Sequence, residues 1–258
     1  MKTECPGWAT PLLAVQLLTR VPVPGLGTLS EEAVRTGLGR AVGWFPLVGA
    51  LVGAVTAATV LLTELFWPRV AAVILALIVE ARLTGAFHED AVADFCDGAG
   101  GGRNPEHTRH IMKDSRIGSY GALGLSLAVA LRAALMVLLP VATVALAIIA
   151  AATFGRLLAA VAMATTPPAP SAEGLGKDIG ARVSGGDVVL ACVTAVPGLL
   201  FFALSTPFAL PLAVIGGAVF LVWFRRLVVR LVGGSTGDCL GFAAYAGQLI
   251  LLLAAVAS

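Results

Sequence analysis

Seven long apolar stretches, each near the roughly 20 residues that a helix needs to cross a bilayer, most constrain what this chain can fold into. Apolar residues make up 58% of the sequence and charged residues only 12%, where soluble domains average about 25% charged. Too few polar residues remain to cover a soluble fold of this size. Because a segment inside a bilayer must satisfy its own backbone hydrogen bonds, each stretch is expected to be a helix. The sequence predicts an all-α, polytopic integral membrane helical bundle with transmembrane helices over about Ala41–Leu62, Val70–Phe87, Ser119–Leu139, Val141–Ala164, Val188–Leu204, Pro207–Phe224 and Cys239–Val256.

Basic residues predict the orientation of this bundle. Lys and Arg gather before the first stretch and after the second, fourth and sixth, whereas the opposite connections carry only Arg69. Positive residues favour the cytoplasmic side, so the N-terminus and the long loops are expected there. We expect one transmembrane domain over 1–258, with a cytoplasmic N-terminal segment at 1–40 and a cytoplasmic acidic active-site loop at 88–118. The net charge of +2 gives no reason to expect a nucleic-acid partner.

The four cysteines indicate neither a disulfide framework nor a zinc site. They are scattered along the chain and form no CxxC pair, so free thiols are expected at Cys5, Cys96, Cys192 and Cys239.

A run of acids at the expected end of the second helix carries the clearest chemistry. Asp90, Asp94 and Asp97 are spaced i, i+4, i+7, and they share one face if the helix continues through them. Three like charges on one stripe repel each other unless a cation neutralises them. Hard cations such as Mg²⁺ take oxygen ligands and commonly share them with substrate phosphates. The run therefore indicates a metal site for phosphoryl transfer, the alternative being a solvated acidic helix end.

The neighbours of this run leave more than one interpretation open. Glu89 lies off the acidic stripe, where it either adds a metal ligand or faces water. His88 is a candidate general base or phosphate ligand, or a structural histidine. Glu80 lies within the second stretch and is a functional candidate by default, or pairs with a neighbouring cation. Arg132 and Arg156 fall within the third and fourth stretches and must face a polar interior or pair with acids.

Two further polar segments are expected on the same face of the membrane. In the first, Lys113 and Arg116 could neutralise phosphate oxygens and Asp114 could complete the metal shell, although positive-inside topology alone accounts for the two cations. The second, Gly233–Asp238, opens the last stretch, where helix N-terminal amides favour phosphate. There Asp238 is an alternative helix cap.

Over nearly its full length the chain resembles the cobalamin synthases, the adenosylcobinamide-GDP ribazoletransferases of bacteria. The likeness rests on these segments, in order: Leu17–Pro24, Trp44–Ala50, His88–Gly98, Met112–Gly118 with Tyr120–Ala122, Glu173–Gly176 and Gly233–Asp238. Two departures stand out. Ala91 occupies a position where the family usually has glycine, and its Cβ works against a close backbone approach. The segment Thr165–Ala172 is proline-rich where relatives often carry basic and aromatic residues.

The resemblance implies an enzyme that joins adenosylcobinamide-GDP to α-ribazole or its 5′-phosphate and releases GMP. It implies Mg²⁺ as cofactor, a multi-pass location in the bacterial inner membrane with lipid around it, and an active site on the cytoplasmic face. The oligomeric state stays open. The implied metal ligands are Asp90, Asp94, Asp97, Glu89 and Asp114. The implied catalytic residues are Asp94, Asp97, His88, Arg116 and Lys113. The implied substrate-binding residues are Arg20, Gly234, Thr236, Asp238 and Glu173.

Two alternatives belong to other classes. A CDP-alcohol phosphotransferase also uses an aspartate cluster near the cytosolic face, but the residue after Asp94 is Phe95, which breaks the usual motif of that family. An ion-coupled transporter would place its acids near the bilayer midplane, whereas these acids gather toward one surface.

Overall fold

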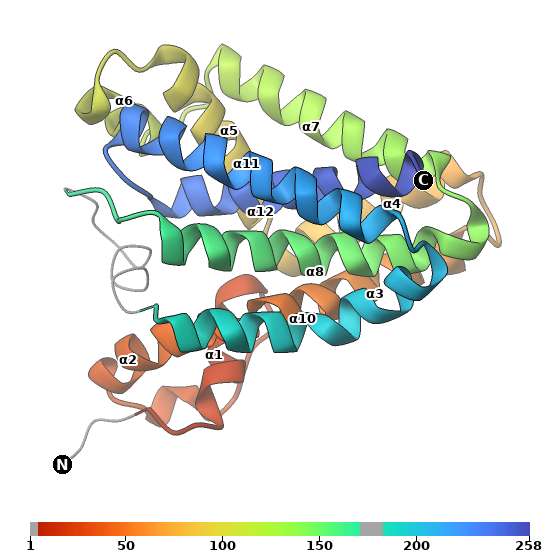
Figure 1. The fold of residues 1–258 in the computed structure, drawn as a ribbon, viewed down its shortest axis with the longest axis horizontal. Coiled ribbons are helices and arrows are strands. Elements are labelled where there is room, and N and C mark those ends of the chain that lie inside the picture. The colour runs from red at the N-terminus through yellow and green to blue at the C-terminus, as the bar shows by residue number, and fades with distance from the viewer. Residues whose placement is uncertain (1–4, 171–182) are drawn as a thin grey trace.

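The computed structural model describes residues 5–170 and 183–258, and this part of the chain is a bundle of helices (Figure 1). Its only β-type pairing is an isolated bridge between Pro168 and Ser235. Short 3₁₀ turns lie at Leu26–Thr28 and Val42–Trp44. The α-helices are α1 (Ala9–Leu18), α2 (Glu31–Ala41), α3 (Phe45–Thr63), α4 (Arg69–Thr84), α5 (Phe87–Gly101), α6 (Pro105–Met112), α7 (Ser119–Leu138), α8 (Val141–Thr165), α10 (Gly185–Ser205), α11 (Ala209–Val232) and α12 (Gly237–Val256).

The predicted membrane bundle is confirmed. Six helical segments in the described residues are long and apolar enough to cross a membrane, and a seventh is added if the bent pair α4–α5 counts as one span. The first of the six runs without a large bend from Glu31 to Thr63, through α2 and α3. Many large apolar side chains on α4, α7, α10 and α11 face outward, as expected for helices that contact lipid.

The sequence prediction was wrong about the second span. It ended this helix at Phe87 and left open whether the helix continues through the acidic run, but α4 ends at Thr84 and α5 turns away from it by 90°. Gly85 and Ala86 both adopt the left-handed conformation at the turn, with φ of 75° and 58°. Left-handed backbone ends an α-helix, so the acids lie on a separate helix.

The sixth predicted span was also too short. Helix α11 continues past Phe224 to Val232, so Arg225, Arg226 and Arg230 lie on exposed helical turns and not in a loop. Long cationic side chains can follow a helix out of the bilayer while their charged ends reach water, which lets the helix continue.

Helix α8 forms the centre of the bundle and packs against α3, α10 and α12 (Figure 1). Small residues bring these helices close together. A Cβ added at Gly155 would come within 2.3 Å of the Ala244 carbonyl oxygen, and one at Gly49 within 2.5 Å of the Ala152 carbonyl oxygen. Close packing of small residues is a main source of helix association in membranes, where lipid is as apolar as the helix surface.

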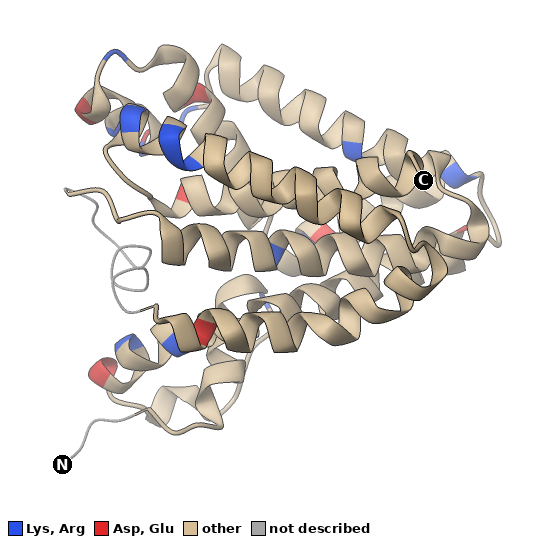
Figure 2. Cartoon of the chain, viewed as in Figure 1, with Lys and Arg blue, Asp and Glu red and all other residues tan. Residues whose placement is uncertain are grey.

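Charged residues gather mostly at the end of the bundle that carries α2, α6 and the last turns of α11 (Figure 2). The opposite end holds an ion pair between Glu64 and Arg69. Glu80, Arg132 and Arg156 lie between the two ends and are buried. This separation fits the alternation of basic connections, and the predicted cytoplasmic N-terminus stays a prediction. The four cysteines are free thiols, as expected.

We predict that replacing Gly155 by leucine separates α8 from α12 and destabilises the fold. The new side chain has no room beside the Ala244 carbonyl, and overpacking of this kind costs about 1–3 kcal/mol. Thermal unfolding in detergent should show a lower midpoint. Gly186→Ala is the control, because the nearest atom to its added Cβ is Ser184 Oγ at 3.5 Å. Equal midpoints for the two variants would contradict the close packing of α8 on α12.

Candidate active site

The break between α4 and α5 places Arg20 beside the first turn of α5. We call α5 the acidic helix, because it carries Asp90, Asp94 and Asp97. The backbone N–H of Arg20 donates to the Leu83 carbonyl at 2.7 Å. A Cβ on Gly85 would lie 2.5 Å from Arg20 Nε, so the glycine makes room for the guanidinium. The predicted substrate-binding Arg20 therefore lies next to the helix that carries the aspartates.

Helix α5 packs directly on α12, and this contact depends on Gly241. A Cβ added at Gly241 would lie 2.4 Å from the Ala91 Cβ. The alanine at 91, which the sequence suggested would work against close approach, is accommodated because glycine stands opposite it on α12. The first turns of the two helices are brought together as a result.

This packing gathers three carboxylates, those of Asp90, Asp94 and Asp238, which we call the acidic cluster. Asp90 is exposed, while Asp94 and Asp238 are partly buried. Asp94 is repelled by Asp90, Asp238 and Asp97, and Asp238 is repelled by Asp90. Within residues 5–170 and 183–258, neither Asp90 nor Asp94 forms an ion pair. The sequence identified Asp238 as a substrate ligand or cap, and it did not place this carboxylate against the other two.

Asp97 has a different environment from the three carboxylates of the acidic cluster. Its side chain connects the end of α5 to the start of α7. Its carboxylate accepts hydrogen bonds from the backbone N–H groups of Gly118 and Gly121, both at 2.7 Å. The residue is 9% exposed. These two N–H groups belong to the first turn of α7, which has no helical partners for them, so Asp97 caps that helix from a distance.

Asp114 and Arg116 form an exposed pair in the loop before α7. The Arg116 guanidinium donates to both carboxylate oxygens, with Nη2 at 2.6 Å from Oδ2. Hydrogen bonding from Arg116 lowers the pKa of the Asp114 carboxyl to about 2. A surface hollow of about 410 Å³ includes this pair together with Asp97, His110 and Tyr120. Lys113 is exposed at the end of α6.

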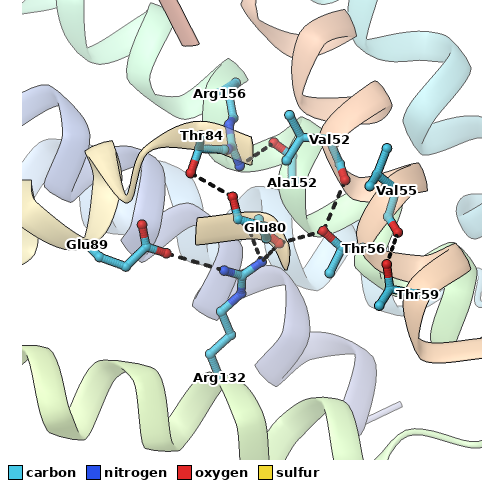
Figure 3. A network of polar contacts seen from close by, with 10 residues as sticks. All are labelled: Val52, Val55, Thr56, Thr59, Glu80, Thr84, Glu89, Arg132, Ala152 and Arg156. Atoms are coloured by element: carbon cyan, nitrogen blue, oxygen red, sulfur yellow. Dashed lines mark hydrogen bonds and ion pairs between the residues drawn. The ribbon is translucent and has the colours of Figure 1, made fainter. Parts of the chain in front are cut away.

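A buried ionic network joins α4, α5, α7 and α3 inside the bundle (Figure 3). Arg132 Nη2 donates to both Glu80 oxygens, at 2.9 and 2.7 Å, and Arg132 Nη1 lies 3.8 Å from Glu89 Oε1. The Thr56 hydroxyl donates to Glu80 at 2.7 Å, and Arg132 stacks over the Tyr245 ring at 5.7 Å. Of the two alternatives considered for each residue, pairing with an opposite charge is confirmed for both Glu80 and Arg132.

Glu89 lies toward Arg132, a partner that the sequence did not predict. Its Oε1 is 3.8 Å from Arg132 Nη1, and its second oxygen, Oε2, is buried with no hydrogen-bond partner in the described residues. A role as metal ligand stays a prediction.

His88 and Arg156 line a partly open cavity beside α5. His88 is 4% exposed and Arg156 is 1% exposed, and both line this cavity with the first residue of α12, Gly237. The catalytic role of His88 stays a prediction.

The Gly233–Asp238 segment forms the entry to α12. Gly234 has φ +148° and lies against Pro167, Pro168 and Ala169, a close contact that a side chain would block. The Thr236 hydroxyl accepts from the Cys239 N–H and caps the helix. The remaining predicted substrate ligand, Glu173, lies outside the described residues.

Within the described ranges, no group of three or more His, Cys, Asp or Glu side chains is arranged to hold a metal ion. The ligand assignments therefore stay predictions. The donor types at the acidic cluster still suit a hard cation, because they are carboxylate oxygens that repel each other.

Comparison with known proteins decides the family. The sequence model described as "Cobalamin-5-phosphate synthase" matches residues 10–256. The chain belongs to this family. A relative from Ralstonia pickettii, named adenosylcobinamide-GDP ribazoletransferase, is 38% identical over 95% of this chain and 94% of its own length. Relatives of the same name from Vibrio cholerae and Sinorhizobium medicae are 36% and 37% identical, over 94% and 91% of this chain and 91% and 90% of their own lengths. No solved structure matches this chain.

In this cobalamin synthase family member, we predict that the buried network is essential for stability. Glu80→Gln removes the charge that compensates Arg132, and breaking a buried pair from one side costs about 3–5 kcal/mol. Thermal unfolding in detergent should show a large drop in midpoint. Adding Arg132→Met to Glu80→Gln should recover part of the loss, because the uncompensated cation is then gone.

Glu31→Gln is the matched control for this prediction. It makes the same chemical change in an exposed pair with Arg35, where the expected loss is at most about 0.5 kcal/mol. If Glu80→Gln costs no more than Glu31→Gln, the network does not stabilise the fold.

Proposed function

We propose that this protein joins adenosylcobinamide-GDP to α-ribazole, or to α-ribazole 5′-phosphate, and releases GMP. Relatives that match along almost the whole chain are named for a ribazoletransferase activity. A hydroxyl oxygen of the ribose attacks the phosphorus bound to the cobinamide arm. The bond from that phosphorus to the oxygen of the GMP phosphate breaks, and the product is adenosylcobalamin or its 5′-phosphate.

The observation that carries this proposal is the acidic cluster where α5 meets α12. A diphosphate substrate is strongly anionic, so carboxylates alone would repel it. A divalent cation such as Mg²⁺ supplies charge neutralisation of the diphosphate oxygens when it is bound. Asp90, Asp94 and Asp238 would hold it, because they are carboxylate oxygen donors whose negative charges repel each other without a cation. Asp97 near the end of α5 and Asp114 in the loop before α7 are the further candidates.

The remaining residues of the site would position the substrates and move the proton. Phosphoryl transfer depends more on alignment and electrostatic stabilisation than on covalent chemistry. The cations that would stabilise the GMP leaving group are Arg20 at the helix break and Lys113 and Arg116 in the loop before α7. His88 or one of the carboxylates accepts the proton of the attacking hydroxyl.

The alternatives from other classes are not favoured. The family match covers residues 10–256, and the relatives carry one transferase name. Asp238 lies in the first turn of α12, at the end of that span and not midway along it, where a transporter would place an ion site.

The test is release of GMP by the purified protein from adenosylcobinamide-GDP and α-ribazole, with and without Mg²⁺. We predict turnover only with the cation. Asp94→Asn should reduce turnover at least about 100-fold, the scale for removing one preorganised charged group. The same change should leave the thermal midpoint equal or higher, because it relieves repulsion from Asp90 and Asp238.

Asp97→Asn is the variant to compare with Asp94→Asn for its effect on stability. An amide oxygen replaces only one of the two carboxylate oxygens that cap α7, so this variant should lose about 1 kcal/mol of stability. Full activity of Asp94→Asn, or full activity after chelation of all divalent cations, would refute the metal assignment.

We also propose that residues 88–118 face the cytoplasm in the bacterial inner membrane. Support comes from the basic residues of the same end of the bundle and from the positive-inside rule. In a variant with the four native cysteines replaced, Ser115→Cys should react with a membrane-impermeant maleimide in inverted vesicles but not in intact spheroplasts. The opposite labelling pattern would overturn the orientation.

A further inference from the structure

A partly open cavity of about 180 Å³ lies beside the first turn of α5, bounded by α1, α3, α5, α8 and α12. Its walls are mostly apolar, with Leu18, Phe45, Met163 and Leu240 among them. A cavity of this kind favours an apolar occupant, and about 150 Å³ is already enough for a benzene ring. The space therefore suits a small aromatic ring system.

Arg156 places a hydrogen-bond donor without an acceptor at the wall of this apolar cavity. The side chain is 1% exposed, and its Nε–H has no hydrogen-bond partner in the described residues. Its Nη1 reaches the Ala152 carbonyl only at 3.4 Å. A buried donor without an acceptor is unfavourable, so an occupant with an acceptor atom would satisfy Arg156.

Charge balance indicates that this occupant is neutral. Arg156 interacts electrostatically with Glu80 and Glu89, as does Arg132. These two carboxylates and two guanidiniums sum to zero formal charge, so the buried group needs no further anion. A phosphate would also find too few donors among the apolar walls to replace its hydration.

The position of the cavity relates it to the proposed chemistry. Phe87 and His88 line it from the head of α5, and Gly237 lines it from α12, next to Asp238. The acidic cluster lies on the same two helices. A nucleoside whose base filled the cavity would have its ribose close to the cluster.

We propose that this cavity is the binding site for the base of the ribazole substrate, with the Arg156 Nε–H donating to the unsubstituted ring nitrogen of that base. A ribazole base is planar, aromatic, neutral and apolar at its rim, and it carries one acceptor nitrogen, as benzimidazole does. The inference rests on the proposed function for the identity of the substrate, and on the cavity itself for the chemistry of the occupant.

Binding of benzimidazole tests the cavity without any need for turnover. Equilibrium dialysis of the purified protein, corrected with a detergent-only blank, should show saturable binding. Indene, which has the same bicyclic shape without the acceptor nitrogen, should bind at least about 10-fold more weakly. Equal binding of the two probes would show that a hydrogen bond from Arg156 to the ring nitrogen does not contribute to binding, and would overturn the proposal.

Ala159→Leu fills the cavity, because Ala159 is one of its wall residues. Ala203→Leu makes the same change in a separate surface groove beside α10 and serves as the matched control. We expect at least about 10-fold weaker benzimidazole binding in Ala159→Leu and unchanged binding in Ala203→Leu, with both thermal midpoints near that of the parent protein. Parent-like binding in Ala159→Leu, or no binding by the parent protein, would overturn the proposal.

Kinetics separate this inference from the proposed function. Ala159→Leu should raise the KM for α-ribazole about 10-fold and leave the KM for adenosylcobinamide-GDP unchanged. GMP release with an unchanged KM for α-ribazole would refute the cavity assignment alone. Benzimidazole binding in the expected pattern, without any GMP release by the parent protein, would refute the proposed function alone.

Discussion

The buried ion pairs of Arg132 are the interaction on which the arrangement of the site depends. Arg132 extends from α7 to Glu80 on α4 and Glu89 on α5, and Tyr245 on α12 covers its guanidinium. Four helices are therefore joined through one side chain. Charges at such depth are costly unless they are compensated, so each partner restricts where the others can lie. Because α5 and α12 also carry the acidic cluster, the network fixes the relative position of the helices that carry those carboxylates.

Two backbone features build the site: the sharp turn between α4 and α5, and the close contact between α5 and α12. At the turn after α4, the left-handed residues Gly85 and Ala86 redirect the chain by 90°. At the contact between α5 and α12, Gly241 allows the Ala91 side chain to approach. The first places the aspartates on a helix of their own, and the second brings Asp238 to them. Asp90 and Asp94 share a helix stripe, whereas the third carboxylate depends on tertiary packing.

Much of the fold followed from the sequence, because apolar length is a strong signal for a membrane helix. Helices α7, α8 and α12 begin and end within a few residues of the predicted bounds. The break at Gly85–Ala86 was missed because one glycine near a helix end is an ambiguous signal. The site residues were recognised through their spacing and through the family resemblance. The partner of Glu89 and the cap formed by Asp97 were not foreseen, since both contacts join residues far apart in the chain.

The capping of α7 by Asp97 ties together the two ends of the segment between α5 and α7. The carboxylate at the end of α5 holds the Gly118 and Gly121 amides directly, so this segment leaves and re-enters the bundle at neighbouring points. Helix α6 within it packs on α5 and α11, and its residues Thr108 and Met112 are buried. The surface hollow that contains Arg116 therefore has a fixed position relative to both α5 and α7.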